Sequence, residues 1–193
     1  MKNHLLLIFA ALAVFSYSFT TPPGTKAASR VANKSLAYPV AGSKSAIKDK
    51  WGASRAGGLR KHKGIDIHAR KGTPVVAISD GIIVNRSYTP IGGKTLWLKS
   101  SQHSWTAYYA HLDQQLVKEG QAVRKGQVIG TVGNTGNART TPAHLHFGVK
   151  KGVSWVNPLP YVKYATKVTG SKNLQQKKAT AAKKTLPAKR TSK

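Results

Sequence analysis

Short runs of β-branched and aromatic residues recur along the middle of the chain and are separated by glycine-rich turns. These runs lie at 74–78, 82–84, 95–98, 105–109, 128–132 and 145–149. Such runs of three to five residues, split by glycine-rich turns at a spacing of roughly ten residues, are typical of an all-β sandwich or barrel. The pattern leaves room for one short helical piece at 114–118, and no longer amphipathic helix is expected.

The N-terminal segment has the pattern of an export signal. Lys2 is followed by an apolar run at 5–15, which is too short to span a bilayer, and then by small residues at 16–18. We therefore expect a signal peptide at 1–18 and an exported protein, localised to the periplasm, cell envelope or medium. An uncleaved membrane anchor is the alternative. Residues 19–36 are rich in Thr, Pro, Ser, Ala and Lys and are interpreted as a linker.

The remainder divides into a globular part at 37–164 and a lysine-rich tail at 165–193. Residues 166–193 hold nine Lys or Arg and no acid, so we expect this tail to be disordered. The formal net charge of the chain is +27, and the globular part itself has 19 Lys or Arg against five acids. Such a balance indicates an anionic partner: nucleic acid, a membrane surface or a charged wall polymer.

The chain contains no cysteine. Disulfides, thiolate metal sites, lipoprotein anchoring and a cysteine nucleophile are thereby excluded. Any metal ion must be held by histidine and carboxylate, and the fold must be stabilised by an ordinary apolar core.

The first arrangement that indicates chemistry is His-Lys-Gly-Ile-Asp at 62–66. In a straight strand, His62 and Asp66 would lie about 13 Å apart, too far to share one ion at zinc–ligand distances of about 2.0–2.2 Å. Gly64 permits a bend that could bring the two together.

The second arrangement is the pair His144 and His146. Residues two apart in a strand point to the same side, so one imidazole can bind a metal ion while the other faces the substrate. Together with His62 and Asp66, one member of the pair gives three ligands and leaves a fourth position for water, which is the layout of a catalytic zinc site. Zinc would make hydroxide available near neutral pH, and the remaining imidazoles could serve as general base and as electrostatic stabiliser.

Four motifs in order resemble the lysostaphin-type (LytM-like) zinc metalloendopeptidases, which hydrolyse peptidoglycan. They are HKGID at 62–66, GTPVVA at 72–77, YAHL at 109–112 and HLHF at 144–147, and the likeness covers about 38–160. The resemblance implies an antiparallel β-sheet groove and one zinc ion per chain.

The same resemblance implies individual roles. His62, Asp66 and His146 would bind zinc, while His111 and His144 would be catalytic and orient or deprotonate the attacking water. The expected substrates are peptide cross-links of peptidoglycan, and we expect a monomer. All five positions are intact, which argues against the alternative of a catalytically silent member that binds the wall or activates another hydrolase.

Other polar and aromatic residues near these motifs have weaker interpretations. His68 could compete as a metal ligand, and Arg55 could lie in the groove. His103 is expected in a solvated loop. Core or groove-wall positions are expected for the tryptophans, and turn positions for two acids: Trp51, Trp97, Trp105 and Trp155; Asp80 and Asp113.

Two other classes of function remain. Residues 120–130 resemble the hairpins of biotinyl and lipoyl carriers, but no lysine is displayed at a hairpin tip. The tail resembles basic nucleic-acid-binding segments, but an export signal makes nucleic acid an unsuitable natural partner. We hypothesise instead that the tail and the basic domain hold the protein on anionic polymers of the cell envelope.

Overall fold

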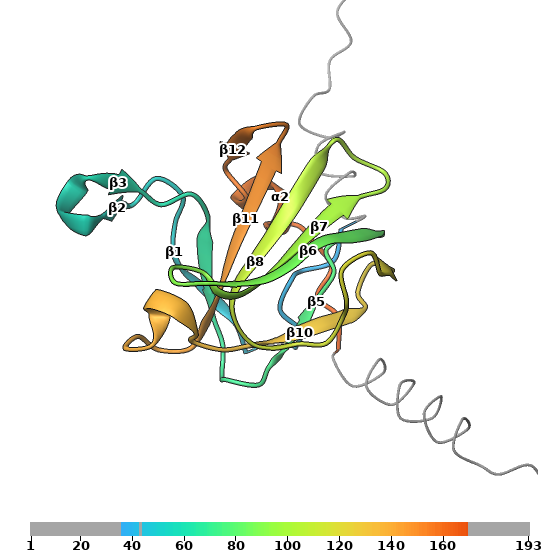
Figure 1. The fold of residues 1–193 in the computed structure, drawn as a ribbon, viewed down its shortest axis with the longest axis horizontal. Coiled ribbons are helices and arrows are strands. Elements are labelled where there is room, and N and C mark those ends of the chain that lie inside the picture. The colour runs from blue at the N-terminus through green and yellow to red at the C-terminus, as the bar shows by residue number, and fades with distance from the viewer. Residues whose placement is uncertain (1–35, 43, 170–193) are drawn as a thin grey trace, which may run out of the picture.

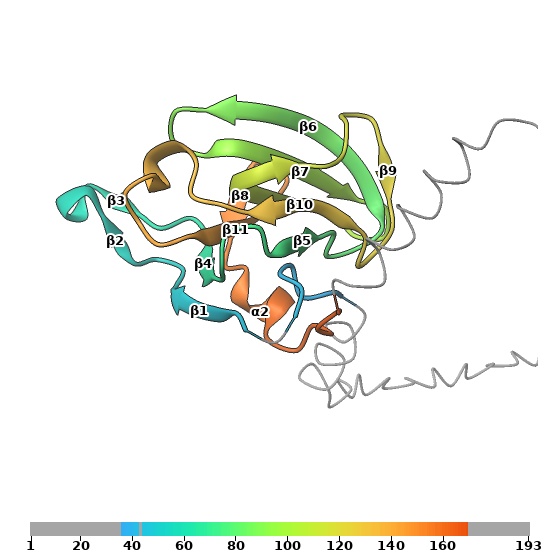
Figure 2. The same ribbon diagram turned by 90° about the horizontal axis from the view of Figure 1, so that it is seen from below.

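A single antiparallel sheet organises the chain, whose structure is a computed structural model that describes residues 36–42 and 44–169. The strand order is β1-β4-β11-β8-β7-β6-β9, with β10 joining β8 to β5 and β12 joining β11 (Figure 1). A separate hairpin, β2–β3, projects from one side of the sheet (Figure 2). The expected all-β, antiparallel fold is confirmed.

The strands have the following bounds. They are β1 Ala46–Asp49, β2 Ser54–Arg55, β3 Arg60–Lys61, β4 Ile65–His68, β5 Pro74–Val76, β6 Gly81–Thr89, β7 Gly93–Ser100, β8 Trp105–Gln115, β9 Ala122–Val123, β10 Val128–Val132, β11 His144–Lys151 and β12 Ser154–Val156. The helical elements of the described residues are all short: η1 Ala56–Gly58, η2 Gly136–Ala138 and α2 Leu159–Val162. No helix of these residues is long and apolar enough to cross a membrane.

Alternation along β11 separates the core from the functional face. Leu145, Phe147 and Val149 are fully buried, whereas His144 and His146 point to the opposite side of the strand. A fully buried aliphatic or aromatic side chain contributes about 1.5–3 kcal/mol to folding. Strand β11 is therefore fixed by its apolar face, and this packing positions the two histidines.

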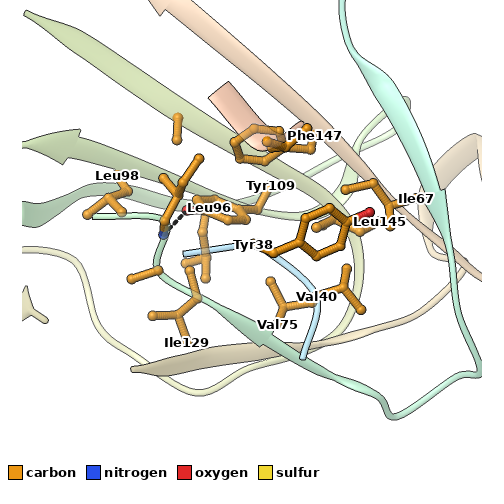
Figure 3. Packing of buried hydrophobic residues seen from close by; sticks show 14 of the residues in the cluster. Tyr38, Val40, Ile67, Val75, Leu96, Leu98, Tyr109, Ile129, Leu145 and Phe147 are labelled. Carbon is orange, nitrogen blue, oxygen red and sulfur yellow. Dashed lines mark hydrogen bonds between the residues drawn. The ribbon is translucent and has the colours of Figure 1, made fainter. Parts of the chain in front are cut away.

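The core lies on the concave side of the sheet, between β8, β7, β4 and β5. Figure 3 shows Tyr109 at its centre, with Leu96, Leu98 and Phe147 around it. The amide of Ile78 donates a hydrogen bond to the Tyr109 hydroxyl at 3.0 Å, which satisfies the one polar atom of this buried ring.

The prediction of a short helical piece at 114–118 is wrong. Strand β8 continues to Gln115, because Gln114 and Gln115 pair with Thr131 and Gly130 of β10. The chain then turns toward β9 without forming a helix. Glutamine favours helices locally, but the cross-strand partner decides the conformation here.

The two ends of the described chain lie side by side. The amide of Thr166 donates to the Leu36 carbonyl at 2.9 Å, and the amide of Tyr38 donates to the Thr166 carbonyl at 2.8 Å. The amide of Gly42 donates to the Val168 carbonyl. Residues 165–168, which the sequence analysis assigned to the tail, are thus paired with the start of the domain. The expected signal peptide at 1–18, most of the expected linker at 19–36 and the tail from 170 lie outside the described residues.

Candidate metal centre

Two side chains of the 62–66 segment meet a third from β11, some 80 residues further along the chain. Their nearest ligand atoms are His62 Nε2, Asp66 Oδ1 and His146 Nδ1, and all ligand atoms of the group lie within 4.8 Å of one another. The two histidine nitrogens are 2.9 Å apart, and they lie 3.1 and 2.9 Å from Asp66 Oδ1. The sequence-predicted ligands therefore meet in one cluster.

Sheet register and one glycine bring these atoms together. His146 and Asp66 are directly paired across β11 and β4, while His62 lies before β4 begins, so the chain bends between it and Asp66. A Cβ atom on Gly64 would lie 2.5 Å from His146 Cε1 and 2.7 Å from the Phe147 carbonyl oxygen. Gly64 is thus required because the backbone passes directly against the His146 ring.

The cluster fits a zinc ion. Two ligands at about 2.1 Å in a tetrahedral arrangement lie about 3.4 Å apart, close to the separations in this triad. Two imidazoles and one carboxylate are a donor set that zinc accepts in catalytic sites. Among the residues that the structure describes, the group consists of these three ligand atoms, so a fourth position could be taken by water.

Neighbouring groups fix the orientation of the ligands. The Nδ1–H of His62 donates to the Lys50 carbonyl at 3.0 Å, which leaves the lone pair of Nε2 toward the cluster. Arg55 Nη2 donates to Asp66 Oδ2 at 2.8 Å, and the same guanidinium forms an ion pair with Asp49. Such partners hold a ligand's tautomer and rotamer and tune its affinity for metal. Arg55 thus contacts the Asp66 oxygen that does not face His62 and His146.

Two further histidines face the cluster. The His111 ring lies 5.0 Å from the His144 ring and 5.9 Å from the His146 ring, centroid to centroid. Nδ1 of His111 donates to the Thr135 carbonyl at 2.9 Å, and Nδ1 of His144 donates to the Pro142 carbonyl at 2.8 Å. In both rings Nε2 is thereby left as the basic nitrogen.

The backbone of His111 is unusual. Its φ is 59°, in the left-handed region that residues other than glycine adopt rarely. The amide of His111 donates to the Gly92 carbonyl at 2.7 Å. A conformation of this kind costs about 1–3 kcal/mol and is found preferentially at functional sites.

Burial makes these ionisable groups unusual. It lowers the pKa of His111 to about 4, with His146 and His144 adding to the effect. It also lowers the pKa of His146, where the nearby Asp66 opposes the shift. Burial alone would raise the pKa of Asp66, but hydrogen bonds with His146 and His62 outweigh it and hold that pKa well below its usual range. At neutral pH the rings of His111 and His146 are thus neutral, and the Asp66 carboxylate is charged.

The structure separates the remaining candidates from this cluster. His68 stacks on His144 at 5.2 Å and is outside the triad. His103 lies in the loop between β7 and β8, as expected, but its ring stacks on Trp105 at 5.3 Å and is half-buried. Trp105 belongs to the core. Asp80 accepts a hydrogen bond from the Lys125 amide, and Asp113 pairs with Lys71.

Sequence reasoning missed the groups that act through their backbone. The carbonyls of Lys50, Thr135 and Pro142 each accept a hydrogen bond from one of the site histidines. A carbonyl is common to every residue, so no residue type could have marked these three positions. Tyr108, whose ring centre lies 6.0 Å from that of His146, was expected only as part of an aromatic strand.

Comparisons with known proteins agree with this geometry. Residues 60–158 match the model of Peptidase family M23. The chain is 40% identical over 91 residues to the peptidoglycan DD-endopeptidase ShyC of Vibrio cholerae, covering 47% of this chain and 20% of ShyC. It is 31% identical over 156 residues to the murein hydrolase activator NlpD of Salmonella typhimurium, covering 81% of this chain and 39% of NlpD.

The fold has a counterpart among solved structures. The catalytic domain of the antimicrobial peptidase lysostaphin from Staphylococcus simulans aligns with a TM-score of 0.54 and 34% identity, over 62% of this chain and 92% of that domain. The chain spans less than half the length of ShyC and of NlpD. The family match, in contrast, covers the whole triad and both further histidines.

Proposed function

Because the chain belongs to peptidase family M23, with a lysostaphin-type fold, we propose that it is an exported zinc-dependent endopeptidase that hydrolyses peptide cross-links of bacterial peptidoglycan. The observation that carries this proposal is the convergence of His62 Nε2, Asp66 Oδ1 and His146 Nδ1. These three residues would hold one zinc ion, which when bound supplies a Lewis acid and lowers the pKa of water.

The chain's own residues supply proton transfer and orientation. His111 and His144 each hold Nδ1 on a backbone carbonyl, so Nε2 is the atom that accepts a proton from water and returns one to the departing amine. Water adds across the peptide bond, the C–N bond breaks, and a carboxylate and an amine are formed. The low pKa of His111 keeps its ring neutral, and thus able to accept a proton, at neutral pH.

The match to NlpD raises a second candidate, a protein that activates another wall hydrolase. This role needs no converging ligand triad. The complete triad, with its guanidinium and carbonyl partners, supports the hydrolase.

Two further parts of the proposal concern location. The pattern at 1–18 supports export. The similarity to a peptidoglycan endopeptidase also supports it, because peptidoglycan lies outside the cytoplasmic membrane. The basic tail would hold the protein on anionic wall polymers. Because residues 166–168 pair with the domain, the test of the tail is truncation after Val168. Equal wall binding by the truncated and full chains at low salt would overturn this role.

The central experiment uses the exported protein and purified peptidoglycan sacculi. The protein is incubated with sacculi, with and without a chelator, and the released fragments are identified by mass spectrometry. His146→Ala removes a ligand, and His103→Ala is the matched control because His103 lies outside the cluster.

We expect peptide fragments from the wild type and from His103→Ala, and none from His146→Ala or after chelation. A folded, zinc-loaded protein that releases nothing from sacculi of several compositions would overturn the hydrolase. Stimulation of a second, purified wall hydrolase would then support the activator.

A further inference from the structure

A row of aromatic rings from β8, β7 and β12 leads away from the metal cluster. The centre of the Tyr108 ring lies 6.0 Å from that of His146, 5.6 Å from that of Trp155 and 4.5 Å from that of Trp97. Tyr108, Trp97 and Trp155 are all half-buried and belong to the face of the sheet opposite the core. These three rings, here called the aromatic shelf, therefore border the space where a substrate would extend from the metal cluster.

A second glycine makes room for the shelf. Gly148 follows His146 by two residues and so lies on the same side of β11. A Cβ atom there would come within 2.6 Å of Trp155 Cζ3 and 3.2 Å of the Lys63 carbonyl oxygen. Trp155 thus packs directly on the bare strand, held by the pairing of Trp155 with Lys150 across β12 and β11.

Lys150 carries a charge onto this shelf. Its ammonium lies 5.8 Å from the centre of the Trp97 ring and 5.7 Å from that of Trp155. A cation over an indole is attracted to the ring face and loses freedom. Lys150 is four residues beyond His146 on the same face, about 13 Å further along the strand. The chain therefore places a positive charge at a defined position, about four extended residues from the metal cluster.

Two more lysines lie near Trp155. Lys61 and Lys63 line a depression together with His62, Trp51 and Trp155. Both lysine side chains are exposed. Since His62 belongs to the metal cluster, this depression opens directly beside it.

Within the described ranges, none of these three lysines forms an ion pair with an aspartate or glutamate within 4.0 Å. The acids are engaged elsewhere: Asp49 and Asp66 with Arg55, Asp113 with Lys71, Asp80 with the Lys125 amide and Glu119 with the Arg86 amide. The field around the shelf is thus positive, and a ligand must supply the balancing charge.

We propose that Lys150, Lys61 and Lys63 form a subsite for carboxylates of the substrate around Trp155, so that the enzyme selects acidic stem peptides over neutral glycine bridges. This inference rests on the proposed function and names its substrate class. The aromatic shelf supplies apolar contact to the peptide, and the lysines read its free carboxylates. A glycine bridge has neither side chains for the shelf nor carboxylates for the lysines.

The test uses the zinc-loaded full chain and three probes, all amidated at the C-terminus: a peptide with free side-chain carboxylates, the same peptide with those side chains amidated, and pentaglycine. Binding is followed by the fluorescence of the tryptophans and by calorimetry, and cleavage by chromatography. We expect the acidic peptide to bind at least about tenfold more tightly than its amide, an advantage that shrinks at high salt.

Variants of Lys150 isolate the subsite. K150M should lose most of the preference for the acid, K150R should keep it, and K118M, in the turn between β8 and β9, should behave as wild type. Because a carboxylate can also bind zinc directly, the decisive quantity is the acid-to-amide ratio lost in K150M. Unchanged melting temperatures would show that the variants fold.

The outcomes separate this inference from the proposed function. Equal binding of acid and amide, or pentaglycine binding as tightly as the acid, overturns the subsite even if all probes are cleaved. The subsite is also overturned if K150M keeps the wild-type ratio of affinities for the acid and the amide. A lysine-dependent preference without cleavage of any peptide supports the subsite while the hydrolase fails.

Discussion

Arg55 and Asp66 are joined by a hydrogen bond of 2.8 Å to the carboxylate oxygen that faces away from the metal cluster. The other oxygen, Oδ1, lies toward His62 and His146. A second carboxylate, Asp49, holds the guanidinium from behind. The orientation of Asp66, a proposed metal ligand, thus depends on the pair of Arg55 and Asp49, neither of which belongs to the cluster.

This relationship predicts the effect of removing the guanidinium. Arg55→Ala should weaken zinc binding by about 10- to 100-fold, because Asp66 loses its orienting partner. The zinc affinity of Arg55→Lys should lie between those of the wild type and Arg55→Ala, since an ammonium group cannot form the two parallel hydrogen bonds of a planar guanidinium. Competition with a chromogenic chelator measures the affinity, and Arg124→Ala, an arginine on the β9–β10 side of the domain, is the control. Zinc affinity that is unchanged in Arg55→Ala would refute the positioning role.

Gly64 gives a second prediction. An added methyl group would meet the His146 ring at 2.5 Å and the Phe147 carbonyl at 2.7 Å, so either the ring or the backbone must move. We expect Gly64→Ala to lower stability by about 1–3 kcal/mol and to lose stoichiometric zinc. Urea unfolding of the metal-free and zinc-loaded proteins separates the two effects. A Gly64→Ala protein that gains as much stability from zinc as the wild type would contradict this reading.

The burial of His111 predicts a pH dependence of stability in the metal-free protein. Its pKa is lowered to about 4 in the fold, against about 6.5 when unfolded. Between these values the unfolded chain binds more protons, so the contribution to stability is complete above about pH 6.5 and is lost as the pH falls toward 4.

His111→Gln should therefore flatten the decline of unfolding free energy in this window, by up to about 1.4 kcal/mol per pH unit. Urea unfolding at several pH values, with the chelator present, gives the slope. A direct NMR titration of His111 offers a second measurement, and a midpoint near 6.5 would refute the burial argument.

Thr135 predicts a separation of binding from turnover. Its carbonyl holds His111, while its hydroxyl donates to the Leu112 carbonyl at 2.9 Å and accepts from the Lys94 amide at 3.0 Å. Thr135→Val removes the hydroxyl contacts and should lower kcat with little change in KM or zinc content. Thr135→Ser keeps the hydroxyl and should restore kcat. Equal losses in both variants would show that the methyl group matters instead.

Local patterns predicted the strands and the histidine pair well, because both depend on alternation within one segment. His144 and His146 share a face for the same reason that Leu145 and Phe147 share the core. The choice of His146 as the third proposed ligand rests on the resemblance to the lysostaphin-type family, because sequence spacing does not determine which of His144 and His146 lies beside Asp66. That choice depends on the register of β11 against β4, which pairs Asp66 with His146 and His68 with His144.

The wrong helix prediction has a tertiary origin. Gln114 and Gln115 favour a helix on their own, and only the distant strand β10 draws them into the sheet. This deciding contact is one that a single sequence does not display. The partial burial of His103 has a local origin, because the Trp105 ring two residues away offers a stacking surface.

The pairing of residues 36–38 with Thr166 also determines how this domain can be joined to other chains. Both ends leave from neighbouring positions on one side, away from the β2–β3 hairpin (Figure 2). The domain can thus be inserted into a loop of a host protein as a cassette, or circularly permuted by a short connection between its ends, without disturbing the sheet. A partner domain fused at either end would be attached at nearly the same place on the domain, so the histidine cluster would face the same way relative to it in both fusions.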